Sequence, residues 1–190
     1  MNIFVLDNNL SKSVEYHIDA HVIKMPLEAA QIISTTLAID HTLGYMPRAL
    51  TRAESVAIRE KRQGWPFYKP THINHPCSIW ARTSNDNFNY LVEYCLQLNR
   101  EKLHRWPEKP GHKSAELIED FVNGWWPTHL ACGATKMTPF AQAMPEDYKE
   151  SDAVSAYRTY YYCEKQYNKA GKHMAIWTNR KPPQWWLEVL

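Results

Sequence analysis

Apolar residues recur at helical spacing along most of the chain, in segments bounded by residues that begin or end helices. Residues three and four positions apart share one face of a helix, so each segment presents an apolar face to a core. The segments expected to be helical are residues 11–40, 76–82, 84–103, 115–123 and 151–170. No strand pattern alternates with them, which argues against an α/β sheet. The sequence predicts a mainly α fold, a compact single domain over residues 1–190 with long irregular loops.

Proline, glycine and serine mark the boundaries of these helices. Pro26 is expected to kink the first helix or to split it in two, and Gly44 closes it. Pro76 suits the first turn of the second helix, and Ser84 suits the N-cap of the third. Residues 125–150 show no helical spacing and are expected to be irregular.

The composition is that of a folded globular protein. The chain has 190 residues, of which 44% are hydrophobic and 22% charged, so wholesale disorder is excluded and one core is expected. No apolar run approaches the roughly 18–20 residues of a membrane span. The four cysteines are far apart and form no CxxC pair, which argues against a disulfide scaffold or a cysteine-rich zinc site. We therefore expect a cytoplasmic protein without a membrane span.

Charge and aromatic residues are unevenly placed. The formal net charge is only +2, yet residues 48–69 carry a local +4 and residues 165–181 a local +5 with no acidic residue. Such segments permit a basic face for phosphates, although ordinary solvated faces give the same count. The chain also has 8 Trp, 11 Tyr and 5 Phe. Aromatic side chains with a polar end are often found where a ligand or a base is bound.

A narrow line of polar residues follows the first predicted helix. It consists of His17, His21, Lys24, Glu28 and Gln31. Apolar residues flank this line on both sides, whereas an ordinary surface helix is polar over about half of its circumference. The flanking residues are Ile18, Met25 and Ile32 on one side and Tyr16, Ala20, Ile23 and Leu27 on the other. The pattern predicts that the polar line faces a cleft; the alternative is a solvated edge between two packing partners.

The polar line offers several kinds of chemistry. Histidine moves protons near neutral pH, and Glu28 is suited to act as a base or to stabilise a developing cation. Lys24, if desolvated beside His21, becomes a candidate nucleophilic amine. His17 and His21 are four residues apart and also suit a divalent metal with Glu28 as a third ligand, but the HExxH pattern is missing.

A second set of residues is a candidate for substrate binding. These residues are Asn74, His75, Trp80, Arg82, Gln142, Tyr157 and Arg158. A helix begins near His75, and helix N-termini bind anions, to which Arg82 can add a bidentate contact. Gln142 has an amide that can bind a base edge. The alternative for these residues is a role in capping and core packing.

Blocks spread over nearly the whole chain carry a resemblance to a known family. They include MNIFVLD, HIDAHVIKMPLEAAQ, NHPCSIWARTSNDNFNYL, TPFAQAMPEDY, AYRTYYYCEK and WTNRKPPQWW. These blocks resemble a family of small proteins of tailed phages, and more remotely the pyrimidine-dimer DNA glycosylases of the endonuclease V type. The resemblance implies a compact all-α enzyme in the host cytoplasm, an N-terminal amine as nucleophile, a glutamate on the first helix, and basic residues that hold bent DNA with a base flipped out.

The chain departs from that pattern at two places. Lys24 stands where the glycosylases have their catalytic glutamate, so the resemblance transfers the carboxylate role to Glu28. Asn2 disfavours removal of the first residue, so the amine would be that of Met1. Either Lys24 or Met1 then supplies the imine-forming nitrogen, or the chemistry differs from dimer excision.

We therefore expect a DNA-acting N-glycosylase on a damaged or modified base, with or without strand scission, and with no cofactor. One alternative is a metal-dependent hydrolase of a nucleotide-sized substrate that uses His17, His21 and Glu28. The other is a non-catalytic phage protein that binds nucleic acid or a host factor.

Overall fold

The computed structural model describes residues 1–60, 66–122, 124, 126–130 and 136–188. Eight α-helices and one 3-10 turn occur in these ranges, and the described residues form no strand. The elements are α1 (Leu10–Glu15), α2 (Asp19–Leu43), α3 (Arg52–Glu60), α4 (Pro76–Ala81), α5 (Asn85–Arg105), α6 (Lys113–Val122), η1 (Glu146–Tyr148), α7 (Ala153–Lys165) and α8 (Gln184–Leu187). The expected mainly α fold is confirmed.

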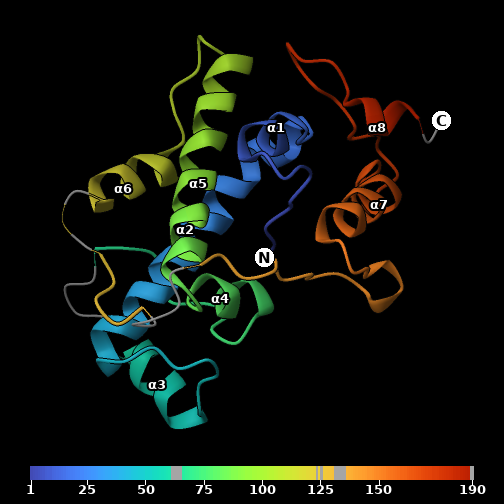
Figure 1. Ribbon diagram of the computed structural model, residues 1–190. Coiled ribbons are helices and arrows are strands. Elements are labelled where there is room, and N and C mark those ends of the chain that lie inside the picture. The colour runs from blue at the N-terminus through green and yellow to red at the C-terminus, as the bar shows by residue number, and fades with distance from the viewer. Residues whose placement is uncertain (61–65, 123, 125, 131–135, 189–190) are drawn as a thin grey trace.

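Helices α2 and α5 form the centre of the molecule and pack against each other more extensively than any other pair. Helices α3, α4 and α6 pack on α2, and α1 packs on α5 (Figure 1). By length and composition α2 could cross a membrane, but most of its apolar stretch is buried inside the protein. Core helices can have the same length and apolar composition, and α2 is the central core helix of this protein.

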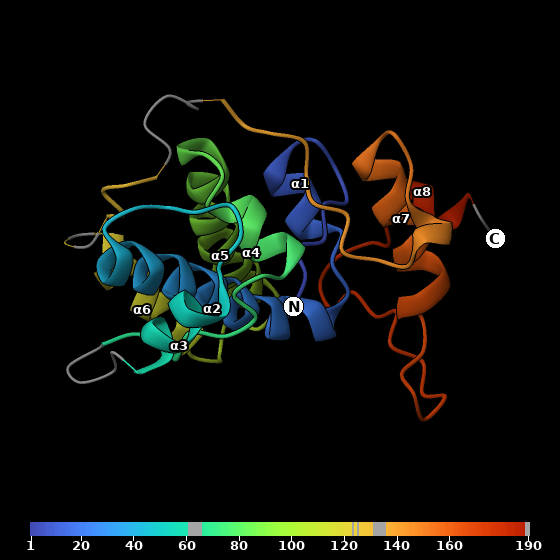
Figure 2. The ribbon, with the colours of Figure 1, turned by 90° about the horizontal axis from the view of Figure 1, so that it is seen from below.

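The N-terminal segment, residues 1–7, lies between this bundle and a C-terminal group made of η1, α7 and α8 (Figures 1 and 2). Asn2 reaches the C-terminal part through Ala143 and Tyr157, and the Arg158 guanidinium donates to the carbonyl of Leu6 at 2.8 Å. The segment thus links the first and last thirds of the chain. This arrangement places the N-terminus at the centre of the protein, beside α2.

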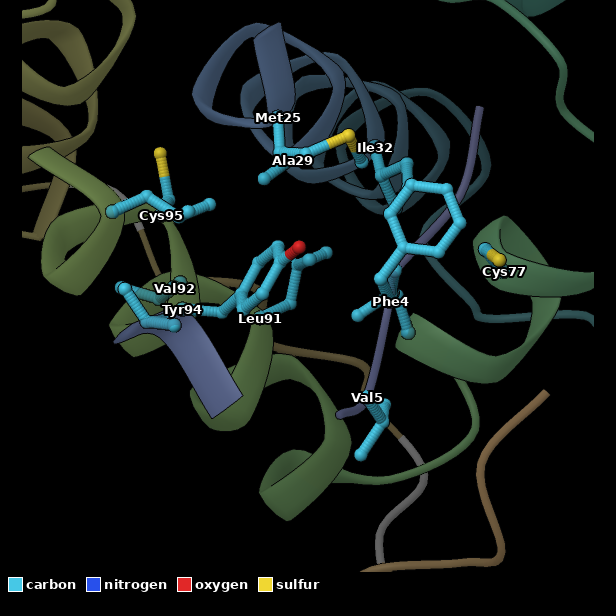
Figure 3. Close-up of a cluster of buried hydrophobic side chains, with 14 of the residues drawn as sticks. Phe4, Val5, Met25, Ala29, Ile32, Cys77, Leu91, Val92, Tyr94 and Cys95 are labelled. Carbon is cyan, nitrogen blue, oxygen red and sulfur yellow. The ribbon is translucent and has the colours of Figure 1, made fainter. Parts of the chain in front are cut away.

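Phe4 and Val5 show how the segment is held in the main core (Figure 3). Both side chains are buried in one cluster with Met25 of α2, Leu91 of α5 and Cys77 of α4. Full burial of a large apolar side chain stabilises a fold by roughly 1.5–3 kcal/mol. The two apolar residues therefore anchor the backbone that carries Met1.

Most predicted boundaries agree with the structure. Pro76 occupies the first turn of α4, and the Ser84 hydroxyl accepts the Asn87 N–H as the N-cap of α5. Gly44 ends α2 with a φ of 70°, in the left-handed region that glycine tolerates best. Helix α7 begins at Ala153 with Asp152 as its N-cap and ends at Lys165, before the expected end at residue 170.

The first predicted helix was wrong in one respect. Its break lies at residues 16–18, not at Pro26, which sits inside α2. Ile18 has an extended backbone and forms the N-cap of α2, so His17 belongs to the junction between two helices. Helix α3 was not predicted, because its apolar positions are sparse; it buries only Ile58.

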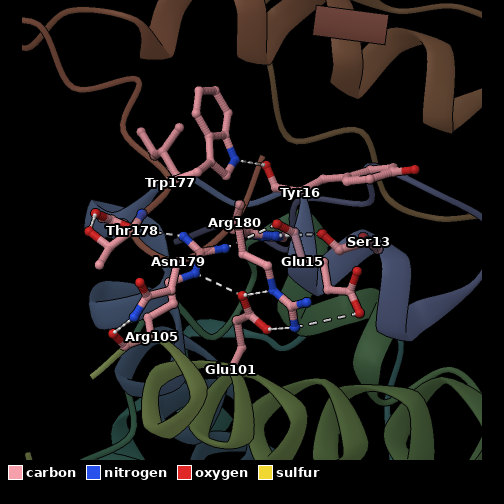
Figure 4. Close-up of polar contacts among 12 residues, drawn as sticks. Ser13, Glu15, Tyr16, Glu101, Arg105, Trp177, Thr178, Asn179 and Arg180 are labelled. Carbon is pink, nitrogen blue, oxygen red and sulfur yellow. Dashed lines mark hydrogen bonds and ion pairs between the residues drawn. The ribbon is translucent and has the colours of Figure 1, made fainter. Parts of the chain in front are cut away.

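Buried charges fix the C-terminal strap, residues 177–180, to α2 and α5 (Figure 4). The fully buried Arg105 guanidinium donates to Asp19 Oδ1 at 2.8 Å and to Glu101 Oε1 at 2.7 Å. Asp19 also accepts the N–H and hydroxyl of Thr178, and Glu101 binds Arg180 through both carboxylate oxygens. Asp19 therefore has a structural role at the start of α2.

Candidate functional site

The N-terminus opens into a polar cavity of about 210 Å³, here called the amine pocket. The residues that line it are Met1, Asn2, Phe4, His21, Lys24, Glu28, Ala143, Tyr160 and Lys165. They come from the N-terminal segment, from α2, from the loop before η1 and from α7. Four of the five residues proposed from the sequence as catalytic therefore meet in one place.

Glu28 is the centre of this group. Its side chain is 12% exposed, and its Oε1 lies 2.9 Å from Lys24 Nζ. Its Oε2 accepts the backbone N–H of Asn2 at 2.9 Å and lies 4.0 Å from the amino group of Met1. One carboxylate thus faces two amines, one on each oxygen. The Lys24 side chain is 63% exposed and can move, whereas the backbone of Met1 is fixed by its neighbour.

Asn2 is a buried amide that holds the N-terminus in place. Its Nδ2 donates to the Ala143 carbonyl at 2.9 Å, and its Oδ1 accepts the Ile3 N–H at 2.8 Å. The hydroxyl of Tyr157 also donates to Oδ1, at 2.8 Å. Because buried amides are costly when unpaired, these contacts determine the path of the backbone and with it the position of the amine.

His21 forms one wall of the amine pocket. Its ring stacks on Phe4 with a centroid distance of 4.8 Å, and its Nδ1 lies 2.6 Å from the Tyr161 hydroxyl. Burial, followed by electrostatic repulsion from His17 in its protonated form and from Lys24 and Lys165, lowers the pKa of His21 to about 2. The ring is therefore neutral at physiological pH, and the pocket does not contain a histidine cation.

His17 lies outside the pocket, in the core. Its Nδ1–H donates to the Ser13 carbonyl at 2.7 Å, and its Nε2 accepts the Tyr94 hydroxyl at 2.9 Å. Complete burial lowers its pKa to about 4. The sequence expectation that His17 shares one helix face with His21 is thus corrected, because the chain turns between α1 and α2.

The surroundings of the polar line also differ from expectation on one side. Ile18, Met25 and Ile32 are buried as expected. Ile23 and Leu27 on the other flank are 48% and 37% exposed, so that side of α2 faces solvent. The polar line is the border between the packed and the open face of α2, and the cleft is formed by the N-terminal segment and α7.

Lys165 and Tyr160, at the far side of the pocket, were not predicted as site residues. The Lys165 ammonium donates to the Tyr160 hydroxyl at 3.0 Å and lies 4.4 Å from the centre of its ring. Lys165 and His21 also line a second cavity of about 270 Å³, here called the hairpin cavity. A hairpin-like loop, residues 166–174, borders it and projects from the molecule (Figure 2).

The loop before α4 is organised by residues that had been candidates for substrate binding. The Arg82 guanidinium is buried and donates to the carbonyls of Pro47, Ile73 and Arg48. Asn74 pairs through its amide with the backbone of Leu50. These groups are thus used within the protein, and the structure gives them a structural role.

His75 is the N-cap of α4, where its Nδ1 accepts the Cys77 N–H at 3.2 Å. Burial, followed by the positive charge of the Met1 amino group, lowers the pKa of His75. This histidine is therefore close enough to the amine to be influenced by its charge, although it does not line the amine pocket.

The remaining predicted binding residues also have partners within the protein. Trp80 is buried against Phe140 and donates its indole N–H to the Thr138 carbonyl. Gln142 bonds both the N–H and the carbonyl of Glu150.

Tyr157 and Arg158 hold the N-terminal segment from the side of α7. Besides binding Leu6, the Arg158 guanidinium lies 3.1 Å from Asp7 Oδ2 and 5.4 Å from the centre of the Trp185 ring. Their effect on the amine pocket is therefore indirect, through the backbone of residues 1–7.

The donor set does not favour a metal. Both nitrogens of His17 are engaged in hydrogen bonds inside the core, so it cannot join His21 and Glu28 as a ligand. In the described ranges no group of three or more His, Cys, Asp or Glu side chains is arranged to hold an ion.

The residues missed by sequence reasoning are Asn2, Phe4, Tyr160, Tyr161 and Lys165. The +5 segment, which begins at Lys165, was the available signal for one of them. Tyr160 and Tyr161 contact Phe4 and His21 across more than a hundred positions, which helical spacing does not reveal. Asn2 and Phe4 lie in a segment outside the predicted helices.

Comparison of the chain with protein-family models, with curated proteins and with solved structures finds no match. The function is therefore inferred from the geometry of the amine pocket.

Proposed function

We propose that this protein is a DNA N-glycosylase that acts on a damaged or modified base through the amine of Met1, with strand scission as a following lyase step. The single observation that carries the proposal is the position of the Met1 amino group. It lies 4.0 Å from the nearly buried carboxylate of Glu28, in a cavity whose other polar groups are cationic or neutral.

Amine and carboxylate have complementary roles in this chemistry. The neutral amine of Met1 forms a bond to C1′ of the deoxyribose, and the N-glycosidic bond breaks with its electron pair leaving on the base. One amine proton passes through Glu28 to the departing base. The second moves to O4′ as the C1′–O4′ bond breaks, which leaves an imine between the nitrogen and C1′.

The imine can react further in two ways. Addition of one water molecule returns the free amine and an abasic sugar. Alternatively, loss of the proton at C2′ and cleavage of the C3′–O bond release the 3′ phosphate and break the strand. During the first step Glu28 also stabilises positive charge that develops on the sugar.

Met1 is a better candidate for the nucleophile than Lys24. The Lys24 ammonium forms a 2.9 Å ion pair with Glu28, and its side chain is largely in solvent. An α-amino group is in general a weaker base than a lysine side chain and loses its proton more readily. We assign Lys24 the role of pairing with Glu28 and adding positive charge at the pocket mouth.

The surface beside the pocket suits a polyanion. Lys165 lines the pocket, and Lys169 and Lys172 lie on the projecting hairpin, in a part of the sequence without acidic residues. Tyr167 on the same hairpin is 58% exposed, which suits stacking against a base. The overall charge of +2 limits non-specific affinity, so binding would depend on these local groups.

Reductive trapping tests the proposal without knowledge of the target base. The protein is incubated with a duplex containing a natural abasic site and cyanoborohydride, and the adduct is located by peptide mass spectrometry. Mass spectrometry of the protein first establishes Met1 as its free N-terminal residue. We expect an adduct on the Met1 amine that forms with wild-type protein and is strongly reduced in Glu28→Gln.

The controls separate the proposed reaction from non-specific lysine chemistry. A duplex with a reduced abasic analogue cannot form an imine and should give no adduct. Glu146→Gln, which changes an exposed carboxylate paired with Lys149, should trap like wild type. Absence of an adduct although the duplex is bound would overturn the proposal, and an adduct on Lys24 would remove Met1 as the nucleophile.

A further inference from the structure

His21 and Lys165 form the boundary between the amine pocket and the hairpin cavity, because both residues line both cavities. Each is held by a tyrosine of α7: His21 by Tyr161 and Lys165 by Tyr160. A group placed at this boundary would touch both donors at once. What these donors offer follows from their hydrogen bonds.

Tyr161 determines which nitrogen of His21 carries the proton. The Tyr161 hydroxyl accepts the backbone N–H of Ile18 at 3.0 Å, and a backbone N–H can only donate. The single hydroxyl proton is therefore available for His21 Nδ1, 2.6 Å away. Nδ1 is then an acceptor, and in the neutral ring the proton must be on Nε2.

His17 shows the opposite arrangement and serves as an internal comparison. Its Nδ1 faces the carbonyl of Ser13, which can only accept, so Nδ1 carries the proton and Nε2 accepts from Tyr94. All of its hydrogen-bonding capacity is used inside the core. At His21, by contrast, no described residue bonds to Nε2, so its N–H is available to a ligand.

Lys165 has donors to spare as well. Its ammonium has three N–H groups, of which one is directed to the Tyr160 hydroxyl. Within the described residues no carboxylate lies at ion-pair distance from Lys165. Its sequence neighbour Glu164 accepts the hydroxyl of Tyr148 instead.

We propose that Nε2–H of His21 and the ammonium of Lys165 together form a binding subsite for an anionic oxygen, filled by a phosphodiester of the substrate strand. A neutral N–H donor and a cation match the acceptor oxygens and the single negative charge of a phosphodiester. The identification of the ligand as a phosphodiester rests on the proposed function, whereas the positions of the protons rest on the protein alone. Tyr161 is the positioning residue that keeps the His21 donor directed to the ligand.

The surroundings of His21 keep the ring neutral. The charged and titratable groups around it come from every neighbouring element: His17 before α2, Lys24 and Glu28 on α2, Tyr160, Tyr161, Glu164 and Lys165 on α7, Tyr167 and Lys169 on the hairpin, and the amino group of Met1. Burial of the ring, followed by the nearby cations Lys24 and Lys165, disfavours a positive charge on His21. The subsite therefore offers the same donor over the whole physiological pH range.

Nitrogen NMR of the histidine side chains tests this assignment directly. In free wild-type protein, long-range ¹⁵N–¹H spectra should show His21 as the Nε2–H tautomer and His17 as the Nδ1–H tautomer. Titration with thymidylyl-(3′→5′)-thymidine, which contains one phosphodiester, should shift His21 Nε2 and the Lys165 ammonium. Inorganic phosphate in a parallel titration tests whether a phosphomonoester can substitute.

Three variants make the test specific. Tyr161→Phe should convert His21 to a mixture of tautomers and weaken dinucleotide binding at least threefold, whereas Tyr94→Phe should leave the His21 tautomer unchanged. Lys165→Gln should abolish the shift at His21 without altering its tautomer. Tighter binding of inorganic phosphate than of the dinucleotide would overturn the assignment of a phosphodiester ligand.

The possible failures are distinguishable. An Nδ1–H tautomer at His21, or no shift with either compound at millimolar concentration, would overturn the subsite even if trapping on Met1 succeeds. Conversely, dinucleotide shifts without any trapped adduct would support the subsite while the amine mechanism falls.

Discussion

The backbone N–H of Asn2 donates to Glu28 Oε2 at 2.9 Å, so the carboxylate that faces the terminal amine also fixes the peptide that carries it. Met1 N lies 4.0 Å from the same oxygen. Position and chemistry of the amine thus depend on one side chain. Changes at Glu28 and Asn2 therefore separate the charge of the site from its geometry.

Glu28→Gln removes the charge but keeps an oxygen that can accept the Asn2 N–H. We expect the imine-forming rate on abasic DNA to fall by roughly 10²–10⁴-fold, the usual contribution of a positioned acid or base. Stability should change little. Single-turnover trapping measures the rate and circular dichroism the fold; a rate within twofold of wild type would exclude Glu28 from the reaction.

Asn2→Leu keeps the size of the side chain but removes the buried amide. The Ile3 N–H and the Ala143 carbonyl then lose the side-chain partner that Asn2 supplies, and each buried unpaired group costs about 1–3 kcal/mol. We expect lower resistance to urea and slower trapping, with Glu28 unchanged. Tyr157→Phe removes the hydroxyl that bonds Asn2 Oδ1, the Ala141 carbonyl and the Ala143 N–H, and should also lower stability. Equal stability of Asn2→Leu and wild type would contradict the role of Asn2 in holding the N-terminal segment.

The buried histidines predict loss of stability in acid. The pKa of His17 is lowered from 6.5 to about 4, so the unfolded chain binds a proton more readily than the folded one between these values. The contribution of His17 to the free energy of unfolding is therefore fully present above pH 6.5. It decreases as the pH falls towards 4, by up to about 3 kcal/mol. His21 acts in the same direction.

Urea unfolding between pH 4 and 8 measures this dependence. His173→Gln, which changes an exposed histidine, should retain the slope, and His17→Gln should reduce it. Direct NMR titration adds a check that does not depend on the stability of a variant. Protonation of His17 with a midpoint near 6.5 in the folded protein would contradict the prediction.

Arg105→Met removes the cation between Asp19 and Glu101 and leaves two carboxylates without their buried partner. Breaking a buried ion pair in this way costs roughly 3–5 kcal/mol. Thermal unfolding should show the loss, and amide exchange at Thr178 should accelerate as the strap is released. Arg100→Gln breaks the exposed pair with Glu93 and should cost no more than about 1 kcal/mol. Similar losses in the two variants would refute the importance of burial.

The projecting hairpin predicts a salt effect on DNA binding. Each phosphate contact contributes about −0.9 to the slope of log affinity against log salt. Lys169→Ala and Lys172→Ala should each reduce the slope by up to that amount. Lys149→Ala, a change near η1 in a lysine already paired with Glu146, should not. Unchanged slopes in both hairpin variants would exclude the hairpin from DNA binding.

The sequence predicted local features well and long-range features poorly. Helical spacing located α5, and Pro76 and Ser84 fixed two helix starts, because these signals act within a few residues. The grouping of His21, Lys24 and Glu28 was also local, since one helix carries all three. The break before Asp19 was missed because the backbone N–H groups there bond to residues far along the chain, Ile18 to the Tyr161 hydroxyl and Asp19 to the Ile176 carbonyl.

The candidate binding residues illustrate the same limit. Arg82 and Gln142 have the side chains that a ligand site would use, but neighbouring backbone groups already satisfy them. Composition cannot distinguish an amide or guanidinium that organises a loop from one that binds a substrate. The hydrogen bonds in the folded protein distinguish the two roles, and for Arg82 and Gln142 they show a residue that organises a loop.

The contacts of Asn2 with Ala143 and Tyr157 have a consequence for the order of events during synthesis. Asn2 meets these partners only when the last third of the chain has been made. Until then residues 1–7 lack the contacts that hold them between α2 and α7. The amine pocket is therefore completed late in synthesis, when α7 closes its far side.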